Sequence, residues 1–188
     1  RFDIHKPKVI DIIRWLDKNG WEIGVHGSYR SYESFDLLQK EKKVLEEIAG
    51  HEIKGTRQHY LNLAPGTWQM QKDCGFVYDA SFGFTNNIGF MEDNVNPFKP
   101  FDDYFTVFPL PVMDDCFMNR KDRWTELKKI IAQAEKSNGI IVFNWHNNVF
   151  NEKEYPGFAS SYEEIIKICK DSGAVFKTLI ELYQQLER

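Results

Sequence analysis

Short apolar runs alternate with amphipathic segments along the whole chain, and this alternation constrains the fold more than any other feature of the sequence. The runs predict strands at 21–25, 52–56, 76–78, 106–110 and 140–144. The amphipathic segments predict helices after Pro7, at 35–49, 65–74, 123–137 and 162–171, and a closing helix after the short apolar run 174–176. Strands and helices that alternate every 20–35 residues or so are typical of a parallel sheet. We therefore predict an α/β fold.

Composition supports one domain over residues 1–188 and excludes two classes of partner. Hydrophobic residues make up 42% of the chain, which is enough for one packed core. The net charge of −4 comes without a concentrated basic face, so we expect no nucleic-acid partner. No apolar run approaches the roughly 20 residues of a transmembrane helix, so we expect no membrane span.

The three cysteines give a weaker indication of whether the protein works in an oxidising or a reducing compartment. Cys74, Cys116 and Cys169 are far apart and odd in number, which argues against a disulfide framework or a cysteine-based zinc site. We expect buried or half-buried free thiols, which slightly favour a reducing compartment such as the cytoplasm.

Polar residues with catalytic chemistry follow the predicted strands. They are His26, Arg57, His59, Asp79 and His146. Because active sites of parallel α/β folds form at the carboxyl ends of the strands, we expect these five side chains to meet at one edge of the sheet.

Each histidine also has a simpler interpretation. His26, surrounded by small and hydroxyl residues, suits a divalent-metal ligand, but it also suits a loop histidine bonded to a neighbouring carbonyl. His59 lies two residues after Arg57, so both side chains can project to one side, or His59 lies on a surface loop. His146 follows an apolar stretch and suits a general acid, or a half-buried histidine with satisfied hydrogen bonds.

The acidic and aromatic candidates also have more than one interpretation each. Asp79 either orients an Arg or His or accepts backbone N–H groups in a tight turn. Asp114 and Asp115 either cap the loop before the next helix or line the cleft, and we favour both of these over a catalytic role. Tyr60 and Trp145 belong to a set of aromatic residues that suit stacking on sugar rings and equally suit core packing.

Two or three histidines, one arginine and one carboxylate at one edge indicate metal-assisted hydrolysis. In that chemistry a divalent metal polarises a carbonyl and activates water. A carboxylate base takes a proton, and a histidine protonates the leaving group.

Four motifs, in order, resemble those of the polysaccharide deacetylases, the NodB-homology group or carbohydrate esterase family four. They are Gly20-Trp21-Glu22-Ile23-Gly24-Val25-His26, Arg57-Gln58-His59-Tyr60, Tyr78-Asp79-Ala80-Ser81 and Asn144-Trp145-His146. The resemblance implies a distorted (β/α) barrel and metal-dependent removal of N-acetyl groups from a sugar polymer or glycoconjugate.

The same resemblance implies roles for individual residues. His26 and His59 would bind a divalent metal, with zinc the expected ion, and His146 would act as the catalytic acid. Arg57 and Asp79 would order the catalytic base. Tyr60 and Trp145 would contact the carbohydrate substrate.

The chain departs from the family pattern at three places. Arg30 stands where a second metal-binding histidine is usual, and His59 stands where proline is more common. The acidic pair of the family's first strand has no counterpart before His26, so we expect a domain that lacks its N-terminal strand or strands. Two alternatives follow: a non-catalytic carbohydrate-binding or scaffold domain on the same fold, and an amidohydrolase acting on a small non-sugar amide.

Overall fold

The computed structural model describes residues 3–188, which form two compact units. Unit 1 contains the residues up to Ser81, together with Lys99–Val107 and Lys177–Arg188. Unit 2 contains Phe82–Phe98 and Phe108–Phe176. Each unit is described by itself below.

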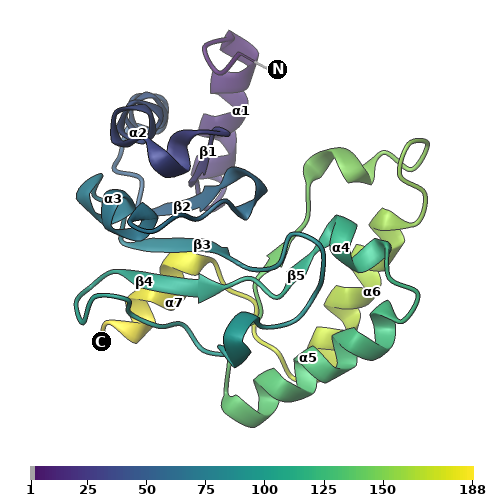
Figure 1. Cartoon of the computed structure of the whole chain (residues 1–188). Helices are drawn as coiled ribbons and strands as arrows, with labels where there is room; N and C mark the ends of the chain where they lie inside the picture. The colour runs from purple at the N-terminus through teal and green to yellow at the C-terminus, as the bar shows by residue number, and fades with distance from the viewer. Residues whose placement is uncertain (1–2) are drawn as a thin grey trace. The chain divides into compact units, whose positions relative to one another are not determined.

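Four helices and most of a parallel sheet make up unit 1 (Figure 1). The helices are α1 (Pro7–Lys18), α2 (Phe35–Ala49), α3 (Thr67–Asp73) and α7 (Leu179–Leu186). The strands are β1 (Val25–Gly27), β2 (Gly55–Gln58), β3 (Tyr78–Phe82) and β4 (Thr106–Pro109), in the order β1-β2-β3-β4, and the chain crosses the boundary between the units within β3 and within β4. β1 pairs with β2, and β2 with β3, in parallel, which confirms the predicted α/β class.

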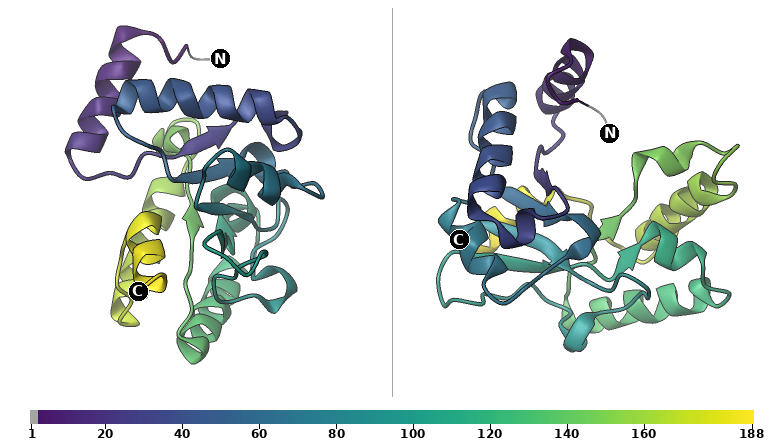
Figure 2. Two further views of the ribbon diagram at one scale, coloured as in Figure 1. Left: turned by 90° about the vertical axis from the view of Figure 1, so that its left-hand side faces the viewer. Right: turned by 45° about the horizontal axis from the view of Figure 1, so that its top comes forward.

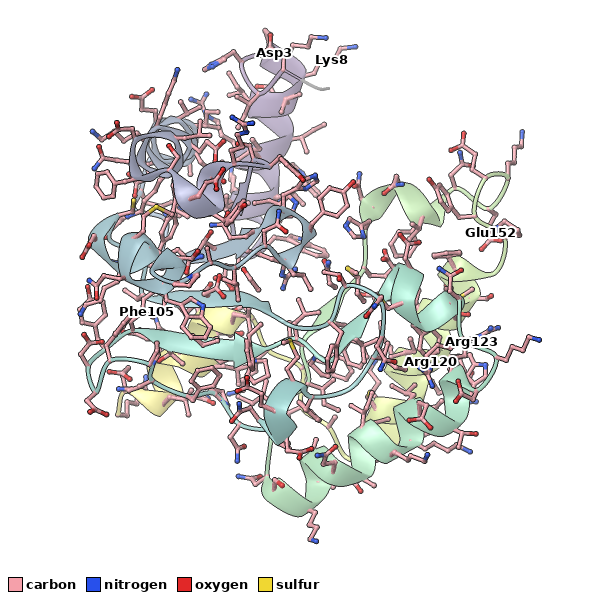
Figure 3. The ribbon with its side chains drawn as sticks, viewed as in Figure 1. Asp3, Lys8, Phe105, Arg120, Arg123 and Glu152 are labelled. Atoms are coloured by element: carbon pink, nitrogen blue, oxygen red, sulfur yellow. The ribbon has the colours of Figure 1, made fainter. Side chains whose placement is uncertain are left out.

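Helices cover the sheet of unit 1 on both sides. α3 and α7 lie on opposite sides, and α1 lies beside α2 (Figure 2). α2 buries Leu38, Leu45 and Ile48, whereas α1 buries no residue despite its apolar face. Phe105, just before β4, is fully buried (Figure 3).

The bounds predicted for the first three strands differ by two to four residues from those of β1, β2 and β3, whereas 106–110 agrees with β4 to within one residue and 140–144 ends with β6. The difference at the first three strands changes how the polar residues are held. His26, Arg57 and Asp79 were expected just beyond their strands, but they lie inside β1, β2 and β3. An apolar run indicates which residues are buried, whereas a strand requires hydrogen bonds to a neighbouring strand. Within 21–27, only Val25–Gly27 pair with a neighbouring strand. The backbones of these residues are therefore fixed by strand pairing.

Unit 2 is a helical layer on a two-stranded parallel sheet. The strands are β5 (Val112–Met113) and β6 (Phe143–Asn144), and the helices are α4 (Asp114–Met118), α5 (Arg123–Ser137) and α6 (Phe158–Asp171). Its core joins side chains of α4, α5, α6 and β5, among them Phe117, Leu127 and Ile165. Arg120 and Arg123 lie near the start of α5 (Figure 3).

Short 3-10 helices complete the chain at Ser31–Glu33, His59–Leu61, Met91–Asp93 and Asn147–Phe150. All three cysteines are buried and free, as expected. Among residues 3–188, no helix has the length and apolar character needed to cross a bilayer.

Candidate active-site residues

The imidazoles of His26 and His59 are in direct contact in unit 1. Nε2 of His26 lies 3.0 Å from Nδ1 of His59, and the rings meet edge to face. His26 is exposed at the end of the sheet and His59 is half-buried. Without a metal ion, one nitrogen donates a hydrogen bond and the other accepts it. Two residues 33 positions apart in the sequence therefore form one pair of hydrogen-bonded imidazoles.

The pairing of β1 with β2 creates this contact. In the register of the two strands, His26 pairs with Arg57 and Gly27 pairs with Gln58. His59 comes directly after Gln58, so it lies at the end of β2 next to His26 on β1. Gly27 has a steric reason to be glycine, because a Cβ there would collide with Oε1 of Gln58 and with Oγ of Ser31. The side chains of Gln58 and Ser31 therefore occupy the space that a Cβ at position 27 would need.

Asp79 holds the end of β2 through Ser81. The fully buried carboxylate accepts hydrogen bonds from the Ser81 hydroxyl (2.6 Å) and backbone N–H (2.8 Å). The Ser81 oxygen in turn accepts the backbone N–H of Gln58 at 2.8 Å, one residue before His59. Gln71 and Trp68 also donate to Asp79, at 2.9 and 3.4 Å. Asp79 thus accepts a backbone N–H, but it does so within β3 and not in the tight turn that the sequence suggested.

The electrostatics around Asp79 involve Arg57. Burial raises the pKa of Asp79, and the hydrogen bonds from Ser81, Gln71 and Trp68 act in the opposite direction. Burial lowers the pKa of the Arg57 guanidinium, while the charges of Asp79 and Glu22 favour its protonated form. Nε of Arg57 donates to the Ala80 carbonyl at 3.0 Å. Arg57 is therefore a positive charge held at a fixed place inside unit 1.

His146, in unit 2, is held by the carboxylate of Asp114, for which no catalytic role was expected. Nδ1 of His146 lies 2.8 Å from Oδ2 of Asp114, and the His146 backbone N–H donates to the same oxygen at 2.6 Å. Asp114 is fully buried and also accepts the Asp115 N–H at 2.7 Å. Burial raises the pKa of Asp114, but the hydrogen bonds from His146 and Asp115 outweigh it and hold the pKa below its ordinary value.

Asp114 and Asp115 were treated alike from the sequence, but they differ in the structure. Asp114 orients a candidate catalytic histidine, whereas Asp115 is exposed. Asp114 follows directly on the apolar β5, which pairs with the strand just before His146. Its position after a strand was the available signal, the same one that singled out the other candidates.

The two aromatic candidates differ in their surroundings. Tyr60 is 64% exposed, and its ring meets that of His59 edge to face, with the centroids 4.5 Å apart. Trp145 packs among Phe117, Phe158 and Tyr162 in the aromatic cluster of unit 2. The packing explanation left open for Trp145 is thus observed, and substrate binding by Trp145 and Tyr60 stays a prediction.

The histidine pair fits part of a metal site. Two nitrogen ligands about 2.0–2.1 Å from a tetrahedral zinc ion are about 3.3 Å apart, close to the 3.0 Å between the His26 and His59 nitrogens. A catalytic zinc ion has three protein ligands, and residues 3–188 contain no cluster of three or more His, Cys, Asp or Glu side chains that could hold a metal. The nitrogens of His26 and His59 are therefore spaced like two ligands of such a site.

The chain belongs to a polysaccharide deacetylase family. The family model described as "WbmS-like: Polysaccharide deacetylase" matches residues 2–156, most of the chain. This match confirms the resemblance drawn from the four motifs. No curated protein matches the chain.

Solved structures show the same fold at low sequence identity. The PuuE allantoinase matches with a TM-score of 0.66 at 16% identity, over 94% of this chain and 62% of its own. A protein of Pseudomonas aeruginosa PAO1 named as a probable polysaccharide deacetylase matches with a TM-score of 0.62 at 13% identity, over 95% and 63%. A Mycobacterium smegmatis protein named for the same group matches with a TM-score of 0.59 at 17% identity, over 96% and 68%. The chain thus spans about three-fifths of the length of the first two structures.

Proposed function

We propose that this protein is a metal-dependent hydrolase that removes N-acetyl groups from a sugar polymer or glycoconjugate. The observation that carries the proposal is the contact between Nε2 of His26 and Nδ1 of His59, at a spacing that suits a shared metal ion. Membership of a polysaccharide deacetylase family supports the choice of an acetylated carbohydrate as substrate.

His26 and His59 would hold the metal, with zinc the expected ion. When bound, such an ion polarises the amide carbonyl and lowers the pKa of a bound water. Each histidine must present an unprotonated nitrogen, so the proton between the two nitrogens would move to the other ring nitrogen of the histidine that carries it, and both imidazoles would stay neutral.

His146 would serve as the proton donor to the leaving amine. Asp114 accepts the hydrogen bond from Nδ1 of His146, which leaves Nε2 as the nitrogen that gives and takes a proton. The imidazole is 45% exposed, whereas its carboxylate partner is fully buried. Asp114 therefore fixes the tautomer and the ring orientation of His146.

Arg57 and Asp79 would order the catalytic base. The half-buried guanidinium of Arg57 is a positive charge that favours the ionised form of a nearby carboxylate. Asp79 supports this arrangement through its charge and through the hydrogen bonds that fix Ser81 and Gln58.

We further propose that the third ligand and the base are the acidic pair of a strand encoded before Arg1, so that residues 1–188 form one N-terminally incomplete domain. The two-ligand set and the three-fifths coverage of the solved structures support this proposal. A strand ending in paired aspartates, encoded immediately upstream, is the expected observation. An upstream sequence without such a strand would contradict it.

The second candidate function is a non-catalytic carbohydrate-binding domain on the same fold. The specific observation in its favour is that residues 3–188 supply two metal ligands instead of three. The fold itself does not separate a polysaccharide deacetylase from an allantoinase, so an amidohydrolase acting on a small non-sugar amide is a third outcome of the test.

Acetate release tests the proposed function. The assay compares this chain, and the chain extended by any residues encoded before Arg1, on N-acetylglucosamine oligomers and on acetamide with added zinc. We expect release from the oligomers that falls at least 100-fold in His26→Ala and in His146→Ala. Release from acetamide alone would favour the small-amide reaction. Tight oligosaccharide binding without release by either form would favour the binding domain.

A further inference from the structure

A histidine outside the candidate site joins α1 to the turn between α2 and β2 in unit 1. Nε2 of His51, in this turn, lies 2.9 Å from Oδ1 of Asp17 in the last turn of α1. Nδ1 of the same ring lies 3.0 Å from the backbone carbonyl oxygen of Glu52. Both ring nitrogens of His51 therefore face oxygen atoms.

These two oxygen atoms determine which protonation state suits the ring. A carbonyl oxygen and an ionised carboxylate only accept hydrogen bonds, so each ring nitrogen must carry a proton to bond to them. A neutral imidazole carries one proton, and its second nitrogen would direct a lone pair at an oxygen atom. The geometry therefore fits the imidazolium form, which donates two hydrogen bonds and attracts the Asp17 carboxylate.

The charged groups around His51 favour the same form. Two surface hollows border the ring, and carboxylates reach them from α1, α2, α7 and the segments before β1 and β2. These carboxylates belong to Asp17, Glu22, Glu46, Glu47, Glu52 and Glu181, whereas the ammonium groups in the hollows belong to Lys43 and Lys54. The hydrogen bonds to the Glu52 carbonyl and to Asp17 raise the pKa of His51 above its ordinary value, although burial acts in the opposite direction.

α1 is held in unit 1 largely by its side that faces α2. It lies beside α2 and buries no residue (Figure 2). Nε of Arg14 donates to the Ile48 carbonyl near the end of α2 at 3.0 Å. The turn that carries His51 is itself fastened to α2, because the Ile53 N–H donates to Oε1 of Glu46 at 3.0 Å. His51 therefore joins a helix without buried residues to a firmly held part of unit 1.

We propose that His51 is a pH-sensitive tether, whose imidazolium holds α1 on the turn between α2 and β2 and whose deprotonation loosens the helix. Loss of the proton removes one of the two hydrogen bonds and the attraction to the Asp17 carboxylate. Loosening would uncover half-buried apolar side chains of α1, such as Ile13 and Leu16. The inference goes beyond the proposed hydrolase and requires neither a metal ion nor a substrate.

The direction of the pH dependence follows from the raised pKa of His51. A group whose pKa is higher in the folded state contributes its full stabilisation below the ordinary value of 6.5. That stabilisation is lost as the pH rises through the raised value. α1 should therefore be firmly docked in mildly acidic solution and looser in mildly alkaline solution.

The first measurement is the NMR titration of the His51 ring in the wild type and in Asp17→Asn. We expect His51 of the wild type to titrate above 6.5. Asp17→Asn keeps the size of the side chain and removes its charge, so it should bring the titration back toward 6.5. A wild-type His51 that titrates at or below this value, or a titration that Asp17→Asn leaves unchanged, would overturn the inference.

Amide hydrogen exchange then measures the effect on α1. Between about pH 5.5 and about pH 8.5, the protection factors of α1 amides should fall about threefold in the wild type, the size of one half-exposed ion pair. They should not depend on pH in His51→Gln, whose side chain does not titrate. His5→Gln is the matched control, since His5 is exposed and lies two residues before α1, and it should behave like the wild type. Equal protection at both pH values in the wild type, or a fall that persists in His51→Gln, would contradict the tether.

Discussion

Asp114 shows how much a single buried carboxylate can determine about a reactive histidine. It is fully buried, accepts hydrogen bonds from the side chain and the backbone of His146, and has a pKa below its ordinary value. A partner of this kind fixes which nitrogen of the imidazole carries the proton. The proposed role of His146 as an acid therefore depends on Asp114 for geometry.

Replacement of Asp114 by Asn should lower the free energy of unfolding by about 1–2 kcal/mol at pH 7, because it removes a buried charge-assisted hydrogen bond. Urea denaturation at neutral pH measures the change. Asp115→Asn is the matched control, since Asp115 is exposed, and it should unfold like the wild type. Equal stability of the Asp114→Asn variant and the wild type would contradict the assigned contact.

The lowered pKa of Asp114 also predicts a dependence on pH. A carboxyl whose folded pKa lies below its ordinary value of 3.8 stabilises the fold fully above that value. This stabilisation is lost as the pH falls through the lowered pKa. Urea denaturation between about pH 6 and pH 3 should therefore show a shallower loss of stability in Asp114→Asn than in the wild type.

Most residues of the candidate site could be chosen from the sequence, whereas their partners could not. His26, Arg57, His59, Asp79 and His146 stand out because each lies at or after an apolar run. Nothing in the sequence shows that Nε2 of His26 would lie 3.0 Å from His59, or that Asp114 rather than Asp115 would face His146. Those contacts depend on strand pairing, which brings together residues more than 30 positions apart.

At the scale of elements, the end of β2 is held by two successive hydrogen bonds from β3. Ser81 links the Asp79 carboxylate to the Gln58 N–H, one residue before His59. Ser81→Ala should lower the free energy of unfolding by about 1–3 kcal/mol, because it leaves a buried N–H and a buried carboxylate short of a partner. Calorimetric zinc titration should also show weaker binding.

Ser160→Ala is the control for Ser81→Ala, because Ser160 is exposed and its hydroxyl bonds only to the Gly157 carbonyl. It should leave both stability and zinc affinity unchanged. A Ser81→Ala variant with full stability and full zinc affinity would show that the two hydrogen bonds of Ser81 do not position His59.

The approach of β1 to β2 gives a second prediction at this scale. Gly27→Ala should destabilise unit 1 by about 1–3 kcal/mol, because the new methyl group collides with Gln58 and Ser31. The same substitution in a Gln58→Ala background should cost less, since the obstructing side chain is gone. Chemical denaturation of the four proteins of this cycle measures the difference. Equal costs in the two backgrounds would contradict the collision.

Helices were more predictable than strands for a physical reason. The bounds predicted for 35–49 and 123–137 coincide with α2 and α5, because a helix is stabilised within one segment by its own periodicity. The first three strands were displaced because their ends depend on a neighbouring strand that the local pattern does not contain. β5, which directly precedes Asp114, has only two residues and is shorter than the apolar runs that singled out the other candidates.

For the molecule as a whole, the order of four motifs predicted the family that the comparison of residues 2–156 confirms. Each motif alone has little specificity, but their order along a parallel α/β chain is a strong constraint. The chain covers about three-fifths of the length of the first two similar structures, and the proposed function assigns two ligands of a metal site to its histidine pair. The proposed hydrolase therefore depends most on whether His26 and His59 bind a metal ion.

Calorimetric titration with zinc of this chain, His26→Ala and His59→Ala tests that claim most directly. His51→Ala is the matched control, because His51 bonds to Asp17 at 2.9 Å and lies outside the pair. We predict one zinc ion per wild-type chain, an affinity at least tenfold lower in His26→Ala and in His59→Ala, and no change in His51→Ala. A wild type that binds no zinc, or variants of His26 and His59 that bind it as tightly as the wild type, would contradict the account.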